Sequence, residues 1–268
     1  MLKAGIIGYG TLGKSIGELI DSGQAGDVLL KSILVRKLPS SLEEISDQCI
    51  VTTNEDVFFT QDLDIIIEAA GHNALKQYGE KALSSGSDLV ILSVGALSDN
   101  ELYHSLQESA SKNQKQMIIP SAAIAGLDRI AAGVLGEIDE ITLITRKHPR
   151  SWYGTIAEEK VNLATITEPY CIFEGNARDA AKLFPENVNV SAALSIAGVG
   201  FDDTKVQVYV DPTIQMNTHT IIAEGEFGKV EISVQNKPYK QNPKSSPIVA
   251  MSVAKVLKNL TAPTVIGL

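Results

Sequence analysis

The chain has 268 residues, of which 44% are hydrophobic and 21% charged, as in a globular protein large enough for one or two domains. Its net charge of −9 argues against a nucleic-acid partner, because phosphate binding requires a basic face. Cys49 and Cys171 fit neither a metal-ligand spacing nor a disulfide framework, so we expect no metal site and a reducing, cytoplasmic location. We expect no membrane partner, since no apolar run reaches the roughly 18 residues that span a bilayer. The first predicted strand starts at the N-terminus, so no signal peptide is expected before it.

The N-terminal stretch predicts a strand, a glycine-rich turn and an amphipathic helix. The turn reads G-x-G-x-x-G, in which Gly8 makes a tight turn, Gly10 leaves room for a pyrophosphate and Gly13 allows close helix packing. The unpaired N–H groups at the start of the helix favour phosphate binding. The residues expected to contact a dinucleotide here are Gly8, Gly10, Thr11, Leu12 and Gly13.

The second predicted strand, Leu29 to Val35, ends in two cations, Arg36 and Lys37. NAD-preferring sites usually carry an acidic residue at this point, about 20 residues past the glycines. Because a cation suits the 2′-phosphate of NADP, we predict that Arg36 contacts the cofactor and that NADP(H) is accepted, with a preference for NADP over NAD left open. The alternative is that both side chains belong to a solvated loop.

Strands and helices then alternate at the spacing of a Rossmann-type, doubly wound parallel sheet. Strands are expected at Asp64 to Ala70, Asp88 to Leu92 and Gln116 to Ile119. A capping box at residues 98–101 precedes one of the intervening helices. Ligands bind outside the carboxyl ends of such strands, which adds Ala70 and Gly71 to the expected cofactor contacts. We predict a dinucleotide-binding domain over residues 1–124, completed by a C-terminal helix within 245–268.

The pattern changes after residue 125. A linking helix is expected at Ala125 to Leu135, and two short helices around 178–184 and 190–197. Strand-like segments lie at 140–146, 170–174, 205–210, 218–224 and 229–235, several of them with a period of two. Residues 125–244 are therefore predicted to form a smaller α+β domain with a mostly antiparallel sheet, for substrate binding, catalysis and dimerisation. In the last helix, Ile248, Met251, Val256 and Leu260 are expected to line one side.

Four places in the second half of the chain carry candidate chemistry. Asn189 either caps a helix or hydrogen-bonds the cofactor. His219 enters a strand after a polar loop, and a histidine suits proton transfer near neutral pH, although such a residue is more often structural. The candidate groups for binding a substrate carboxylate are Arg150, Lys244, Ser245 and Ser246, the last three at a predicted helix start. The alternative for Arg150 is an exposed loop, and the alternative for residues 244–246 is an ordinary capped helix with a solvated lysine.

Taken together, these stretches resemble the L-aspartate dehydrogenase family. The matching segments are G-Y-G-T-L-G at 8–13, P-S-A-A-I-A-G-L-D at 120–128, F-E-G-N-A-R-D-A-A-K-L-F-P-E-N-V-N-V at 173–190, D-P-T-I-Q-M-N-T-H at 211–219 and N-P-K-S-S at 242–246. The resemblance implies oxidative deamination of L-aspartate to oxaloacetate and ammonia with NAD or NADP, through an imino intermediate. It also implies a homodimer and a link to pyridine-nucleotide biosynthesis. Matched by position, Ala123 and Asn189 correspond to cofactor contacts and His219 to the catalytic acid/base.

Other interpretations remain open at this point. One is another two-domain reductase of aspartate-derived pathways, similar to dihydrodipicolinate reductase or homoserine dehydrogenase. Another is a dinucleotide sensor without catalytic activity. The sequence alone leaves undetermined the physiological direction, the dimer interface, the pose of the substrate and the cations that bind each carboxylate.

Overall fold

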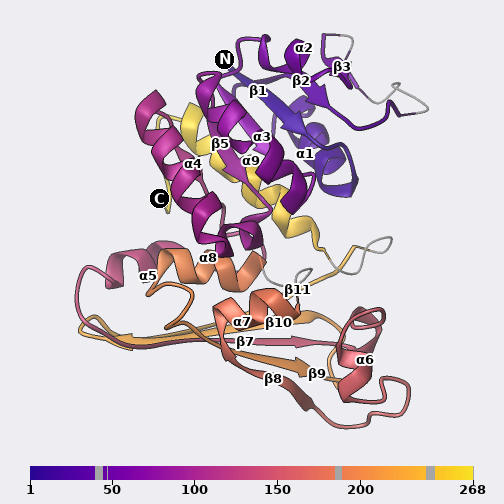
Figure 1. Ribbon diagram of the computed structural model, residues 1–268, viewed down its shortest axis with the longest axis vertical. Helices are drawn as coiled ribbons and strands as arrows, with labels where there is room; N and C mark the ends of the chain where they lie inside the picture. The colour runs from indigo at the N-terminus through magenta and orange to yellow at the C-terminus, as the bar shows by residue number, and fades with distance from the viewer. Residues whose placement is uncertain (40–44, 47, 185–188, 240–244, 268) are drawn as a thin grey trace. The chain divides into compact units, whose positions relative to one another are not determined.

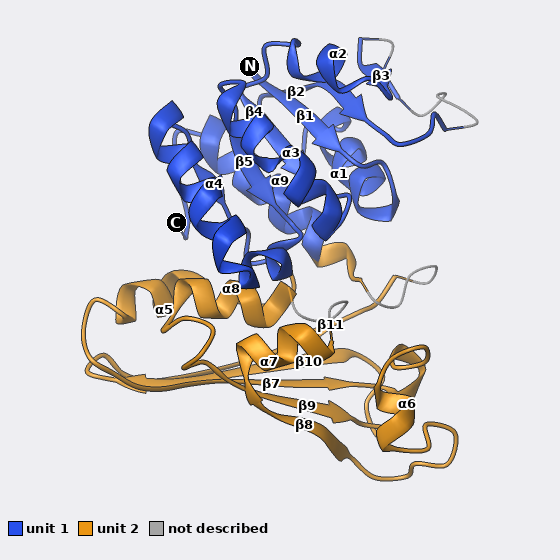
Figure 2. Cartoon of the chain, viewed as in Figure 1, with its two compact units in different colours: residues 1–122, 249–268 blue, residues 123–248 orange. Residues whose placement is uncertain are grey.

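The computed structural model describes residues 1–39, 45–46, 48–184, 189–239 and 245–267. The chain divides into two compact units, coloured separately in Figure 2. The first consists of Met1–Ala122 with Val249–Leu268, and the second of Ala123–Ile248. The chain thus leaves the first unit after residue 122 and returns to it near its C-terminus.

The first unit is built on a six-stranded parallel sheet (Figure 1). Its strands are β1 (Leu2–Ile7), β2 (Val28–Leu34), β3 (Ile50–Thr52), β4 (Ile65–Glu68), β5 (Asp88–Ile91) and β6 (Met117–Ile118). They lie in the order β3-β2-β1-β4-β5-β6, which confirms the predicted doubly wound fold. The order reverses between β1 and β4, so the carboxyl ends of these strands mark the edge where such sheets bind ligands.

Helices cover both faces of this sheet because its strands are apolar on both sides. The core of one face joins Ala4 and Ile6 of β1 to α1 (Thr11–Asp21) and to α9 (Pro247–Thr261). The other face packs against α2 (Glu55–Phe59), α3 (His72–Ser84) and α4 (Asn100–Asn113). Two short elements complete the chain path, the 3₁₀ turn η1 (Val94–Ser98) and, in the second unit, η2 (Pro149–Ser151).

Several details differ from the sequence-based expectation. The strand β3 was not predicted, because three residues at a sheet edge leave no periodic pattern. The helix α4 is capped by Asp99, whose carboxylate accepts the Leu102 N–H, whereas the hydroxyl of Ser98 donates to the carbonyl of Gly95. The predicted capping box is therefore wrong: Asp99 caps the helix alone, because Leu102 at the third helical position has no side-chain acceptor.

The buried face of α9 is also not the predicted one. Its buried residues are Ala250, Val253, Ala254 and Leu257. By contrast, Ile248, Met251 and Leu260 are 40%, 53% and 47% exposed. Small side chains allow a helix to approach a sheet closely, so the alanines contribute to the core here, although they add little to an apolar pattern.

The second unit contains a five-stranded sheet in the order β11-β10-β7-β9-β8. Its strands are β7 (Ile138–Lys147), β8 (Tyr170–Asn176), β9 (Lys205–Val210), β10 (Asn217–Gly225) and β11 (Gly228–Asn236). The strands β7 and β9 run parallel and the other neighbouring pairs antiparallel, which confirms the predicted mixed, mostly antiparallel sheet.

One face of this second sheet is covered by helices and the other is largely polar. The helices α5 (Leu127–Gly133), α7 (Ala177–Leu183) and α8 (Asn189–Ala197) lie along one side of it, and α6 (Ala157–Lys160) lies near one end (Figure 2). Ile141 packs under Gly198, just after α8, where a Cβ atom would approach the Ile141 Cδ1 atom to 2.7 Å. Residues of β7 and β10 with odd numbers therefore face the covered side.

Candidate active site

In the first unit, the glycine turn joins β1 to α1 at the carboxyl edge of the sheet. Gly8 has a φ of +95°, a conformation that favours glycine. A Cβ atom at Gly13 would lie 2.1 Å from the carbonyl oxygen of Gly8, so the close contact between helix and turn requires glycine there. At Gly10, by contrast, an added Cβ would meet no atom within 4 Å. The contact between Gly13 and Gly8 is thus tightly packed, whereas the space beside Gly10 is open.

The start of α1 is suited to an anion. Gly10 occupies the N-cap position without a side-chain cap, and the first turn contains no acidic residue. Leu12 packs partly against the core, so its backbone rather than its side chain is available to a ligand. Because the first N–H groups of a helix lack intrahelical partners, this turn fits the pyrophosphate of a dinucleotide.

Two backbone hydrogen bonds bring neighbouring strand ends to this turn. The Gly8 N–H donates to the carbonyl of Leu34 at 2.8 Å, two residues before the exposed Arg36. The Ala69 N–H donates to the carbonyl of Ile7 at 2.9 Å, and Ala70 and Gly71 follow it, both exposed. The structure therefore gathers the predicted cofactor contacts of the first unit at one edge of the sheet.

A buried carboxylate, which the sequence analysis did not single out, anchors this edge. Glu68 is 1% exposed, and its Oε1 atom accepts the N–H groups of Ala70 and Gly71 at 2.8 and 2.9 Å. Ser93 donates its hydroxyl to Oε1 and its N–H to Oε2, both at 3.0 Å. Burial raises the pKa of Glu68, while these donors act in the opposite direction. Glu68 thus ties the ends of β4 and β5 together.

Replacing Glu68 by glutamine is expected to change how stability depends on pH. The pKa of Glu68 is higher in the folded than in the unfolded chain. Its favourable contribution to folding stability is therefore complete below the pKa of the unfolded state, and it is lost as the pH rises through the pKa of the folded state. The free energy of unfolding of the wild type should fall relative to Glu68→Gln by up to about 1.4 kcal/mol per pH unit in that window. Denaturant unfolding of both proteins across this range measures the difference, and parallel curves would refute it.

In the second unit, His219 lies on the covered face of the sheet. It is 4% exposed and stands opposite Thr145 of β7 and Val234 of β11. Its Nδ1 atom is 3.0 Å from the Thr145 hydroxyl oxygen. This is the hydrogen bond of the ring within the described part of the chain, which leaves Nε2 available to a ligand. Burial, and to a lesser extent the charge of Lys147, lowers the pKa of His219 to about 3, so the ring is neutral at physiological pH.

Lys147 is a second residue that the sequence analysis did not select. It lies on the same face of β7 as Thr145 and is 5% exposed. Its Nζ atom stands 5.6 Å from the ring centroid of Trp152, whose indole N–H donates to the Lys147 carbonyl at 3.1 Å. Trp152 is fully buried and packs edge-on against Phe184. A rigid aromatic wall therefore holds a cation close to His219.

The segment that begins the second unit reaches the same face. The carbonyl of Ala123 accepts a hydrogen bond of 2.7 Å from the side chain of Asn236, which pairs with Asn217 at the start of β10. Ala123 is therefore anchored near the strand that carries His219. Asn189, the other predicted cofactor contact of this unit, is exposed and is the first residue of α8.

The predicted carboxylate-binding residues are less clearly placed. The exposed guanidinium of Arg150 donates to the Gln215 carbonyl at 3.2 Å, in the loop before β10. The hydroxyl of the buried Ser246 donates to the Lys237 carbonyl at 2.7 Å, and Ser245 accepts the Tyr239 N–H at its carbonyl. Lys244 lies outside the described residues. The side chains of Arg150 and Ser246 thus already donate hydrogen bonds within the protein.

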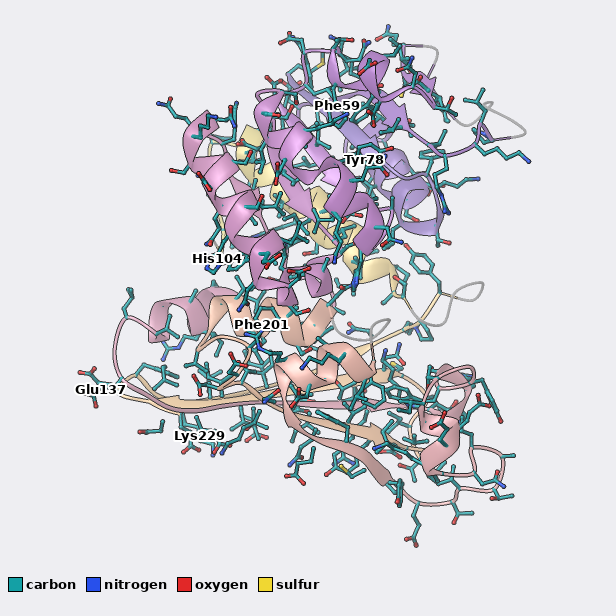
Figure 3. All side chains as sticks on the ribbon, viewed as in Figure 1. Phe59, Tyr78, His104, Glu137, Phe201 and Lys229 are labelled. Carbon is teal, nitrogen blue, oxygen red and sulfur yellow. The ribbon has the colours of Figure 1, made fainter. Side chains whose placement is uncertain are left out.

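The remaining features do not add further candidates. His104 is exposed on α4 (Figure 3). Among the residues that the structure describes, no group of three or more His, Cys, Asp or Glu side chains could hold a metal ion. Within the same described ranges, no helix has the length and hydropathy needed to cross a bilayer.

Comparison with known proteins identifies the family. The L-aspartate dehydrogenase of Methanosarcina barkeri is 39% identical over 274 aligned positions that cover 100% of both chains. The chain belongs to the L-aspartate dehydrogenase family. The L-aspartate dehydrogenase of Ralstonia pickettii is 37% identical and the alignment covers 97% of each chain. Residues 128–260 match the family model for the C-terminal part of aspartate dehydrogenase, and residues 8–120 match the NAD-binding domain of homoserine dehydrogenase.

Solved structures agree with this fold. The crystal structure of aspartate dehydrogenase from Thermotoga maritima superposes with a TM-score of 0.81, at 23% identity and with 100% of both chains covered. Homoserine dehydrogenase from S. aureus gives a TM-score of 0.59 at 15% identity, covering 97% of this chain and 77% of the other. As a member of the L-aspartate dehydrogenase family with an NAD-binding domain, the protein is an NAD(P)-dependent amino-acid dehydrogenase.

Proposed function

We propose that this enzyme oxidises L-aspartate with NAD or NADP and that water hydrolyses the product imine to oxaloacetate and ammonia. The observation that carries the proposal is the pair formed by a neutral, buried His219 and the buried cation Lys147 on one face of the second sheet. A proton acceptor beside a cation is what deamination of a dicarboxylic amino acid requires. The family membership of the whole chain supports the same substrate.

The nicotinamide, when bound, accepts the Cα hydrogen of the substrate together with its bonding electron pair. The groups that would hold the cofactor are the turn residues Gly8 to Gly13, with Ala70, Gly71 and Arg36 from the neighbouring strands and Ala123 and Asn189 from the second unit. When the substrate nitrogen is a neutral amine, its lone pair forms a C=N bond as this hydride leaves, so the intermediate is the protonated form of iminoaspartate. The turn fits this role because it is open at Gly10 and its helix start is uncapped.

His219 then serves as the base and the acid of hydrolysis. In the tautomer in which Nδ1–H donates to the Thr145 hydroxyl, the Nε2 atom carries the lone pair and takes a proton as water forms a C–O bond to the imine carbon. The protonated ring returns that proton to the nitrogen and, neutral again, takes the proton of the new hydroxyl group as the C–N bond breaks, so that ammonia leaves and the carbonyl forms. Substrate carboxylates near Lys147 would offset its charge and raise the low pKa of His219, which makes the ring a better base when substrate is bound.

The carboxylates of the substrate need cations or N–H donors. Lys244, Ser245 and Ser246 at the start of α9 and Arg150 of η2 are proposed contacts of this kind. Arg150 follows β7 directly, and Ser245 and Ser246 directly precede α9, which agrees with the usual location of binding residues on connecting segments.

A direct assay tests this proposal. Purified protein is incubated with L-aspartate and either NAD or NADP, and in the reverse direction with oxaloacetate, ammonia and each reduced cofactor. We expect turnover in both directions. Turnover with dihydrodipicolinate or aspartate semialdehyde instead would indicate one of the related reductases, and cofactor binding without any turnover would indicate a sensor.

Arg36 is proposed to bind the 2′-phosphate of NADP. It is exposed after β2, and the chain carries no acidic residue at the adjacent positions 35 and 37. Replacing Arg36 by aspartate should lower the kcat/KM ratio of NADP to NAD by about tenfold or more, since a hydrogen bond between charged groups contributes about 1.5–3 kcal/mol. Lys112→Asp, at an exposed position near the end of α4, is the control. An unaltered ratio would refute the role of Arg36.

The wider context follows from the same proposal. A homodimer, a cytoplasmic location and a contribution of iminoaspartate to pyridine-nucleotide biosynthesis are proposed from the family resemblance. Gel filtration with light scattering tests the first of these. Capture of the imine by a downstream enzyme, measured as product formed in a coupled reaction, tests the last.

A further inference from the structure

The buried carboxylate of Glu68 has no part in the proposed reaction. It stands at the end of β4 and is 1% exposed, and a carboxylate is rarely buried so deeply unless hydrogen-bond donors surround it. Its oxygen atoms accept hydrogen bonds from the backbone N–H groups of Ala70, Gly71 and Ser93 and from the Ser93 hydroxyl, at 2.8 to 3.0 Å. These bonds fix the orientation of the two peptide groups that join Ala69, Ala70 and Gly71.

The same bonds decide which polar groups this loop presents to a ligand. In a trans peptide group the N–H and the C=O point in opposite directions. Because the N–H groups of Ala70 and Gly71 point to Glu68, the carbonyls of the same two peptide groups, which belong to Ala69 and Ala70, point away from it. Within the part of the chain that the structure describes, neither carbonyl accepts a hydrogen bond. The loop therefore offers a ligand two acceptors, while its two N–H donors are already used.

The loop after β4 lies directly beside the glycine turn. A Cβ atom at Gly8 would lie 2.9 Å from the Ala69 carbonyl oxygen and 2.7 Å from the Ala70 Cβ atom, so the two backbones are in contact there. The strand β2 flanks β1 on its other side, where Gly8 donates to the Leu34 carbonyl. In dinucleotide-binding sheets the adenosine ribose meets the end of the second strand, and the pyrophosphate meets the glycine turn. The remaining part of the cofactor, the nicotinamide riboside, therefore extends toward the loop after β4.

We propose that Glu68 is a positioning residue for the nicotinamide half of the cofactor. By accepting the N–H groups of Ala70 and Gly71, it directs two carbonyl oxygens toward the hydroxyl groups of the nicotinamide ribose, which donate hydrogen bonds to them. Since the loop is held in this orientation before the ligand arrives, binding costs little conformational entropy. The inference rests on the proposed function only in placing the cofactor at the glycine turn, and it is independent of the amino-acid substrate.

The test compares the binding of NADH and of ADP, which lacks the nicotinamide riboside, to the wild type and two variants. Glu68→Met removes both oxygen acceptors at similar length, so the Kd for NADH should rise about tenfold or more, while the Kd for ADP stays within twofold. Glu68→Gln keeps one oxygen that can accept the N–H groups of Ala70 and Gly71, so its Kd for NADH should stay within about threefold of the wild type. Glu108→Met, at an exposed glutamate of α4, is the matched control and should change neither Kd. Fluorescence titration measures NADH, and calorimetry measures ADP.

Equal losses of NADH and ADP affinity in Glu68→Met would show that Glu68 only holds the edge of the sheet together, and would overturn the proposal. An unchanged Kd for NADH in that variant would overturn it as well. If the variant does not fold, the ¹³C resonances of the Ala69 and Ala70 carbonyls in the wild type serve instead: a shift with NADH but not with ADP supports the proposal, and no shift, or the same shift with both, overturns it. These binding measurements need no turnover of aspartate, so a failure of the proposed reaction is distinguishable from a failure of this inference.

Discussion

Replacing His219 by alanine should lower kcat for L-aspartate by about a thousandfold, in line with the usual contribution of a general acid/base. The variant removes the Nε2 lone pair that would take a proton from water, and it leaves the cofactor-binding turn of the first unit unchanged. The Kd for NADH or NADPH, measured by fluorescence titration, should therefore stay within twofold. Steady-state kinetics give kcat, and His104→Ala, at an exposed histidine of α4, is the matched control.

An unchanged kcat in His219→Ala would remove this residue from the mechanism. A fall in kcat with an equal fall in cofactor affinity would indicate damage to the fold instead. Asparagine in place of His219 provides a second variant, since its amide can keep a hydrogen bond to Thr145 while it lacks a titratable nitrogen. We expect it to be as slow as the alanine variant.

The same substitution has a pH-dependent effect on stability. Burial lowers the pKa of His219 to about 3, while the unfolded chain takes up this proton near pH 6.5. The contribution of the neutral ring to the free energy of unfolding is complete above pH 6.5. It is lost as the pH falls toward 3, by up to about 1.4 kcal/mol per pH unit. Denaturant unfolding of the wild type should show this additional loss relative to His219→Ala.

The second large effect is expected at the glycine turn. Gly13→Ala should destabilise the first unit by about 2 kcal/mol or more, because the new Cβ would lie 2.1 Å from the Gly8 carbonyl oxygen and 3.1 Å from its carbon. Alanine is favoured over glycine within a helix by about 1 kcal/mol, so a net loss shows that the steric term is larger. Thermal unfolding gives the change in stability, and cofactor binding should weaken at least tenfold.

Gly10→Ala separates packing from ligand contact. Its φ of −78° is accessible to alanine, and nothing lies within 4 Å of the added Cβ. The melting temperature should therefore change little, while the Kd for the cofactor rises at least tenfold if the pyrophosphate lies against this backbone. An unchanged Kd would show that the dinucleotide does not approach Gly10. An unchanged melting temperature in Gly13→Ala would refute the packing role of Gly13.

The parallel sheet could be predicted well from the sequence because strands buried on both faces are continuous apolar runs. The run at β4 shows this, since Ile65, Ile66 and Ile67 are all fully buried. The buried face of α9 could not be predicted in the same way, because its core contacts depend on Ala250 and Ala254. Periodicity reports where large apolar residues lie, not how closely a helix approaches its neighbour.

The candidate site was predictable to a smaller extent. His219 was a candidate from its place in the sequence, and the family resemblance matched it to the catalytic acid/base. Its partner Thr145 lies 74 positions away in the sequence and is brought to it by strand pairing. Lys147 was hidden within a run of basic residues. The alternation of β7 separates them, since Arg146 stacks on Tyr209 on the polar face while Lys147 faces the covered one. The sequence of residues 143–147 shows no alternation of apolar and polar residues, so the burial of Lys147 is revealed only by the folded strand.

The return of the chain to its first unit has a consequence for biosynthesis. Ile6 and Leu257 belong to one hydrophobic core, although nearly the whole chain separates them. The nucleotide-binding unit therefore cannot complete this core until its final helix has left the ribosome, whereas the segment 123–248 is already available by then. A nascent chain stalled before residue 249 should be cleaved readily by protease within the N-terminal half, and release of the full-length chain should restore its protection.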